Sequence, residues 1–187
     1  MKTLLPKLLN GRLAHAGALL AVIAAVSASI AWSSQPKGRV KLGGTWVGRY
    51  GDITWTGTYS PDSSGQNAMV SLQWITMGAD FEALFASLGA EDASIASGFI
   101  SMVGRDTATG KLIWYLRTQG TTTPPVAGQI KAIMVMANEW HYTSPTTAVG
   151  NHNLKIYLPD AQGSMVPDEA NLYLELNFDN VPHVKIF

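Results

Sequence analysis

The chain has 187 residues, which suits one domain of ordinary size, and 47% of them are hydrophobic, which is enough to form a core. Charged residues make up only 14%, well below the usual quarter, so disorder driven by charge is not expected. The chain has no cysteine, which excludes disulfides, thiolate catalysis and cysteine-ligated zinc.

The N-terminus has the pattern of an export signal. Residues 1–12 carry three positive charges, and residues 13–32 contain no Asp, Glu, Lys or Arg. A basic start, an apolar stretch and small residues near its end are typical of a signal peptide. The apolar stretch is also long enough to cross a bilayer, so an uncleaved anchor over residues 13–32 is the alternative. We therefore expect residues 1–31 to be a signal peptide or N-terminal membrane anchor, and residues 32–41 to be a linker.

Export would place residues 42–187, a single β-domain, in the periplasm or outside the cell. Three of the 13 basic residues and none of the 13 acidic residues precede residue 32, so the remaining chain has a net charge of about −3. Such a domain lacks the basic surface that nucleic acid requires. We expect no nucleic-acid partner, and contact with a membrane only through the N-terminal segment if it stays uncleaved.

Most of the β-domain consists of strand-like segments separated by turn residues. Trp55, Gly57 and Tyr59 alternate with threonines, and such alternation is typical of a half-buried strand. A last apolar segment, residues 183–187, is in position to close the sheet. Eight longer segments of this kind precede it: residues 45–50, 52–59, 67–77, 98–106, 111–119, 129–140, 152–159 and 171–179.

One segment, residues 79–89, has the period of a helix instead. Asp80 is the expected N-cap and Gly89 the expected end, and residues 90–98 would add a further turn. The apolar residues of this segment fall at i, i+3, i+4 and i+7, on one stripe: Phe81, Leu84, Phe85 and Leu88.

Strands that are separated by hairpin-length turns favour an antiparallel sheet, and eight of them suffice to close a small barrel. We predict a mainly β fold: an antiparallel β-barrel or barrel-like sheet of about eight strands, interrupted by one amphipathic helix. A sandwich, or an open sheet with the helix across one face, is the alternative. Residues 107–110 and 141–151 are expected to be loops.

No catalytic motif is present, so no enzymatic activity is expected. The chain lacks the G-x-S-x-G, P-loop and G-x-G-x-x-G motifs. His141, His152 and His183 have no second ligand at a recognised spacing, so we expect them on the surface or in loops, and we expect no metal and no cofactor. A hydrolase or isomerase site would require Glu139, His141 and His152 to meet in one pocket. The acidic segment 160–169 lacks the further Asp or Asn residues of a calcium loop.

The tryptophans are the main candidates for contacts with a ligand. Trp46, Trp55, Trp74 and Trp114 lie in four different predicted strands. Tryptophans at strand alternation most often belong to the core. In a barrel with room inside, the same residues would line a ligand cavity, which is concave and largely apolar.

The segment Gly44-Thr45-Trp46 matches the G-x-W signature that opens the first strand of lipocalins and related calycin barrels. The chain also resembles this family in the length of its domain and in its many short strands. It departs from the family by having no T-D-Y-like motif, by offering Lys185 where lipocalins carry an Arg near the last strand, and by placing its helix after the third strand. The resemblance implies a barrel that Trp46 closes at one end and that binds small hydrophobic molecules.

Two functions of different classes follow from these patterns. The first is an exported, non-catalytic barrel-like protein that binds a small hydrophobic ligand or lipid. The alternative is an envelope structural or protein-interaction domain with a filled core, no ligand cavity, and an exposed apolar patch or open sheet edge.

Overall fold

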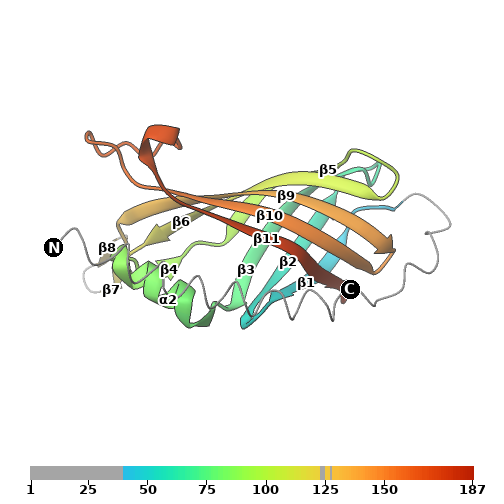
Figure 1. Cartoon of the computed structure of the whole chain (residues 1–187), viewed down its shortest axis with the longest axis horizontal. Coiled ribbons are helices and arrows are strands. Elements are labelled where there is room, and N and C mark those ends of the chain that lie inside the picture. Colours follow the sequence, from blue (N-terminus) through green and yellow to red (C-terminus); the bar gives the residue numbers. More distant parts are fainter. Residues whose placement is uncertain (1–39, 123–124, 127) are drawn as a thin grey trace. The chain divides into compact units, whose positions relative to one another are not determined.

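The computed structural model describes residues 40–122, 125–126 and 128–187, and these form a closed antiparallel β-barrel with one α-helix (Figure 1). The chain divides into two compact units, residues 1–33 and 34–187, and every described residue belongs to the second. The predicted signal segment and most of the predicted linker lie outside the described residues. The predicted barrel is confirmed, and the sandwich and the open sheet are wrong because the strands close on themselves.

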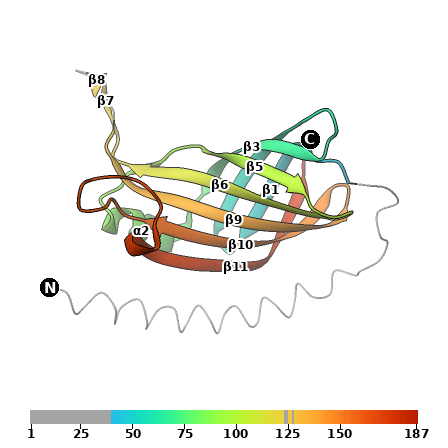
Figure 2. The same ribbon diagram turned by 90° about the horizontal axis from the view of Figure 1, so that it is seen from above.

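Eight strands of the described part form the barrel wall, and each pairs with the barrel strands that precede and follow it in the chain. β11 pairs with β1 and so joins the last strand to the first. Figure 2 shows β6, β9, β10 and β11 side by side along one wall. In order around the barrel the strands are β1 (Gly44–Tyr50), β2 (Ile53–Pro61), β3 (Asn67–Thr76), β5 (Ala96–Met102), β6 (Thr107–Arg117), β9 (Ile130–Ser144), β10 (Thr147–Tyr157) and β11 (Leu172–Lys185).

The core lies inside the barrel because alternate residues of each strand face inward. On β2, Trp55 and Tyr59 are buried while Thr58 between their positions is exposed, as the alternation predicts. The inward residues of β6 are completely buried at Leu112 and Trp114. The chain enters β1 through Gly43 and Gly44, whose positive φ angles favour glycine.

The helix, α2 (Gly78–Ser87), lies between β3 and β5 at one end of the barrel (Figure 1). Gly89 has a φ of +68° directly after the C-cap, as expected for a helix stop. The predicted N-cap is wrong: Met77 occupies that position, and Asp80 lies in the first helical turn. The predicted extension of the helix is also wrong, because β4 (Asp92–Ala93) and β5 follow.

Two predicted loops are strands in the structure. β6 begins at Thr107 and β10 at Thr147, so the turns before them are confined to residues 103–106 and 145–146. The polar residues of both segments face outward on strands whose other face is buried, and this concealed the strands in the sequence. A small ladder of β7 (Thr121–Thr122) and β8 (Pro125–Val126) lies between β6 and β9.

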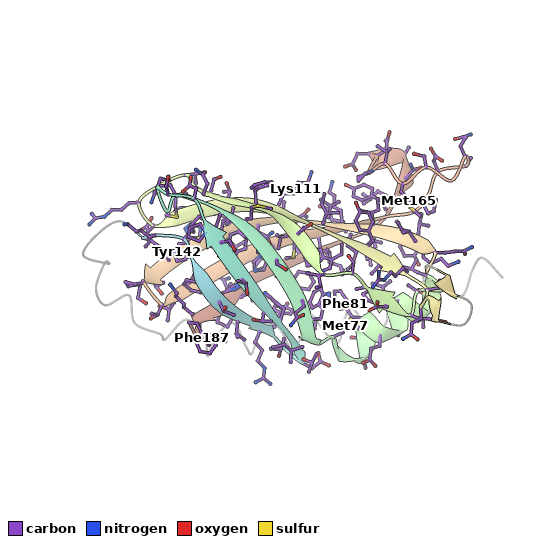
Figure 3. All side chains as sticks on the ribbon, turned by 180° about the vertical axis from the view of Figure 1, so that it is seen from behind. Met77, Phe81, Lys111, Tyr142, Met165 and Phe187 are labelled. Atoms are coloured by element: carbon purple, nitrogen blue, oxygen red, sulfur yellow. The ribbon has the colours of Figure 1, made fainter. Side chains whose placement is uncertain are left out.

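A second, small hydrophobic cluster lies outside the barrel wall. Ile133, Val135 and Tyr157 face outward on β9 and β10, yet all three are buried. The connection between β10 and β11 covers them with Met165 (Figure 3) and includes a short 3-10 helix, η1 (Glu169–Asn171). The acidic connection of residues 158–171 therefore has a packing role.

Candidate functional site

All four candidate tryptophans belong to the barrel interior. Trp46, Trp55 and Trp114 are buried, and Trp74 is partly buried where α2 meets the barrel. The Trp74 ring stacks on that of Trp114 at a centroid distance of 5.7 Å and meets the Trp55 ring edge-on at 5.9 Å. Trp46 stands apart from this group, with its rings against Tyr59 and Tyr142.

The aromatic rings form a continuous row along the barrel interior. At one end Phe81 of α2 contacts Trp74, and at the other end Tyr142 contacts Trp46. Phe81 and Tyr142 lie toward opposite ends of the barrel (Figure 3). Between these ends the row passes through two histidines, which touch the rings of Trp55 and Trp140: His152 and His183. Aromatic rings therefore occupy much of the space that the barrel encloses.

His152 and His183 form a buried pair at the middle of this row. Each side chain is only 3% exposed, and their Nε2 atoms are 3.0 Å apart. The Nδ1 atom of His152 lies 2.7 Å from Oδ1 of Asn138, which is also buried. The amide nitrogen of Asn138 donates to the carbonyl oxygen of Met136, so its Oδ1 is the acceptor that faces His152.

This geometry fixes where the protons of the pair lie. His152 must carry a hydrogen on Nδ1 to donate to Asn138, so in its neutral form Nε2 is an acceptor. His183 must then donate from Nε2 to His152. Burial lowers the pKa of His152 to about 4, and burial and then the neighbouring His152 lower the pKa of His183 to about 3. Both imidazoles are therefore neutral at pH 7.

Backbone features of β10 and β11 make room for the pair. The pairing of these strands shifts register between Gly150 and His152, opposite Asp179 and Asn180. Asn180 has a φ of +57°, and its backbone N–H donates a hydrogen bond to Asn151 Oδ1. This bulge reverses the alternation of β11, so that Phe178 and His183 both face inward.

Gly150 supplies the space that the two imidazole rings occupy. A Cβ atom at this position would lie 2.6 Å from Cε1 and Nε2 of His152 and 2.9 Å from Nε2 of His183. Neighbouring strands thus contribute a bulge, a glycine and an orienting amide to one pair of side chains. A buried polar pair costs stability unless its hydrogen bonds are made, and the bonds of His152 to Asn138 and to His183 are both formed.

Three buried indole N–H groups have no hydrogen-bond partner among the described residues. They belong to Trp74, Trp114 and Trp140. Trp46 differs, because its Nε1 donates to the carbonyl oxygen of Gly43 at 3.3 Å. Unpaired buried donors are uncommon, and they are a feature of sites that accept water or a ligand.

The sequence-based placement of the histidines is partly wrong. His141 is exposed as expected, with its Nε2 atom 2.6 Å from Oε1 of Glu139. His152 and His183 are instead core residues. Glu139 and His141 lie on the outer wall and His152 on the inner one, so the three do not meet in one pocket, and that enzymatic hypothesis is wrong. His152 shares its alternation with Leu154 and Ile156, a signal that could have located it.

Two of the three carboxylates of residues 158–171 accept hydrogen bonds from the backbone. Asp160 Oδ1 accepts from the N–H groups of Gln162 and Ser164, and Asp168 Oδ1 accepts from that of Ala170. Glu169 pairs with Lys155. The described part of the chain holds no group of three or more His, Asp or Glu residues that could ligate a metal ion together.

No helix within residues 40–122, 125–126 and 128–187 is long and apolar enough to cross a bilayer. Comparison of the chain with protein-family models, with curated proteins and with solved structures finds no match.

Proposed function

We propose that the protein is exported and binds a small, mainly apolar molecule at the α2 end of its barrel without catalysing a reaction. The observation that carries this proposal is the packing of α2 on aromatic rings of the barrel, two of which have indole N–H groups without a hydrogen-bond partner among the described residues. Phe81 lies against the rings of Trp74 and Phe178, at centroid distances of 5.8 and 6.2 Å. Trp114 stacks on Trp74 in turn, and the buried indole N–H groups of both have no partner among the described residues.

The joints of α2 suit a segment that can move away from the barrel. Gly78 and Gly89 flank the helix with φ angles of +72° and +68°. Its first turn has no side-chain cap, and only Phe81 and Phe85 are fully buried. Hinges are commonly a few residues at the ends of an element, and short elements with few buried side chains open most readily. Displacement of α2 would expose Trp74 and give a ligand access to the interior.

The donors set the chemistry of the ligand. An apolar body would replace Phe81 on the rings of Trp74 and Phe178. A hydrogen-bond acceptor, such as a carbonyl, hydroxyl or carboxyl oxygen, would satisfy the indole N–H of Trp74 or Trp114. Fatty acids and other oxygenated lipids have this combination, which agrees with the ligands that the lipocalin resemblance implies. Kinship with lipocalins is part of this proposal. It is supported by the closed barrel and by the contact of Trp46 with Tyr142, which lies toward the end of the barrel away from Phe81.

The direct experiment measures binding to the interior tryptophans. Oleate and 1-anilinonaphthalene-8-sulfonate are titrated into the purified protein while tryptophan fluorescence is followed, and native mass spectrometry with lipid extraction detects a bound species. We expect saturable quenching that Trp74→Phe weakens and Trp46→Phe leaves intact, because Trp46 lies at the far end. The proposal fails if no species is bound and neither probe quenches the fluorescence.

Export and anchoring are tested separately. The N-terminal sequence of the product that leaves the cytoplasm is determined, and a start near Ser29 or Trp32 is the expected result of signal cleavage. A start at Met1 in a membrane fraction would show the anchor over residues 13–32.

One observation favours the alternative of an interaction domain. Met69 and Phe99 lie directly opposite each other on β3 and β5, with 59% and 64% of their surfaces exposed. An exposed apolar pair on a sheet is a common element of protein contacts. If no ligand binds, the purified protein is used to capture a partner from the cell envelope. Loss of that partner with Phe99→Ser, but not with Ile75→Ser, would assign this second function.

A further inference from the structure

We propose that His152 and His183 form a two-coordinate site for a soft monovalent metal ion, of the class of Cu⁺ and its surrogate Ag⁺. The proposal goes beyond ligand binding at α2 and concerns a different part of the interior. It starts from the geometry of two imidazoles that direct their Nε2 atoms at one another across 3.0 Å.

The surroundings of His152 are those of a metal ligand. Its Nδ1–H donates to Asn138 Oδ1, which fixes the ring and directs the Nε2 lone pair at His183. Metal-bound histidines in proteins almost always donate their other ring nitrogen to such an oxygen. Asn138 is held in turn by the carbonyl oxygen of Met136.

His183 can offer the same atom after a change of tautomer. Its Nε2 hydrogen would move to Nδ1, the ring nitrogen that does not face His152. An ion then replaces the shared hydrogen between the two Nε2 atoms, and no net proton leaves the site. Two metal–nitrogen bonds of about 2 Å each require a separation of about 4 Å, so the rings must move apart by about 1 Å in total.

The ligand set selects the class of ion. Among the described residues, no group of three or more His, Asp or Glu side chains could hold a metal ion together. Zn²⁺ requires about four ligands, and Ca²⁺ and Mg²⁺ require about six or more oxygens, so two histidines alone do not suit these ions. A filled-shell monovalent ion such as Cu⁺ is stable between two ligands in a line, and imidazole is a good ligand for copper. The rings of Trp55 and Trp140 flank the histidines and exclude water, which disfavours a strongly hydrated divalent ion.

Two backbone features, a bulge and a glycine, make room for this pair in the barrel interior. The bulge at Asn180 turns His183 inward, and Gly150 removes the side chain that would collide with both imidazole rings. The bulge sets the direction of the His183 side chain, and Gly150 sets the space that both rings share.

The test titrates Cu⁺ into the purified protein under reducing, oxygen-free conditions, in competition with a chromophoric Cu⁺ chelator. We expect one Cu⁺ per chain, bound at least 100-fold more weakly by His183→Gln. The matched control, His141→Gln, removes an exposed histidine and should bind as the wild type does. Equal affinity in His183→Gln, with its fold verified by near-ultraviolet circular dichroism, would overturn the proposal.

X-ray absorption of the wild-type protein with one equivalent of Cu⁺ is a second test. It uses no variant, so its result does not depend on whether His183→Gln folds. We expect two nitrogen ligands at about 2 Å and no sulfur. A sulfur ligand would place the ion on surface methionines such as Met69 and would likewise overturn the assignment.

Discussion

The neutral state of His152 and His183 has a consequence for stability. The folded pKa values, about 4 and about 3, lie below the ordinary value of 6.5, so the unfolded chain binds more protons between these limits. Stability is therefore complete above pH 6.5 and falls as the pH drops toward 4. Each histidine that stays neutral costs about 1.4 kcal/mol for every pH unit below 6.5. No carboxylate of the described chain bonds to either ring to offset this cost.

Urea denaturation at pH 7.5 and pH 4.5 checks this expectation in the wild type and in His183→Gln. The variant should lose less stability between the two pH values, because it has one fewer group to protonate on unfolding. His141→Gln, which changes an exposed histidine, is the control. An equal change in the free energy of unfolding between pH 7.5 and pH 4.5 in all three proteins would show that the buried pair does not control the pH dependence of stability.

Gly150→Ala tests whether space at this position supports the pair. The new methyl group would overlap the His152 ring, and relief requires one of two packed imidazoles to move. We expect a loss of about 2 kcal/mol in the free energy of unfolding, which is typical of overpacking. Gly104→Ala is the control, because its Cβ would meet only ordinary contacts at 3.6 Å or more. Chemical denaturation of both variants measures the difference.

The sequence predicted the interior aromatic residues but not the paired histidines. Trp55 and Tyr59 were identifiable because the alternation of β2 is unbroken. His183 was not, because a strict two-residue period from Leu174 to Phe178 would turn it outward, and the bulge at Asn180 reverses that phase. A bulge depends on the partner strand as well as on its own residues.

At the scale of elements, α2 packs on one end of the barrel through two buried side chains, Phe81 and Phe85. The contribution of Phe81 to stability can be tested. Phe81→Ala should cost about 3 kcal/mol, the low end for truncating a buried phenylalanine, because the site is at the barrel mouth. Glu82→Ala, on the exposed side of the helix, should change stability by less than about 0.5 kcal/mol. Hydrogen exchange should show faster opening of residues 78–88 in Phe81→Ala, with strands β9 and β10 unaffected.

The helix and the hairpins differ in how well the sequence located them. The stripe of Phe81 and Phe85 predicted α2 well, because both residues face the barrel. The local pattern predicts loops at the first residues of β6 and β10, because threonine, glycine and asparagine are common in turns. Their place in strands follows from pairing with β9, which supplies long-range contacts that no local pattern contains.

At the scale of the whole molecule, the barrel depends on the seam between β1 and β11. Three residue pairs connect these strands, and Thr45 exchanges backbone hydrogen bonds with Ile186 and Phe187 beyond them. Deletion of residues 183–187 removes the seam together with His183. We expect loss of cooperative unfolding, because an open sheet leaves one side of the core exposed.

The control for this deletion is Phe187→Ser. The Phe187 side chain is 83% exposed, and only its backbone contributes to the seam, so cooperative unfolding should persist. Thermal denaturation followed by near-ultraviolet circular dichroism distinguishes the two proteins. A cooperative transition in the deletion variant would show that the remaining strands fold without closure.

The seam also sets the order in which the protein can be made. β1 is the first described strand to be synthesised and β11 the last, yet each is the neighbour of the other. A chain that has made β1 but not yet β11 therefore has one unpaired edge on β1, a state in which strands can join a wrong partner. The closure that protects both edges of the finished barrel thus leaves β1 unprotected for as long as β11 is missing.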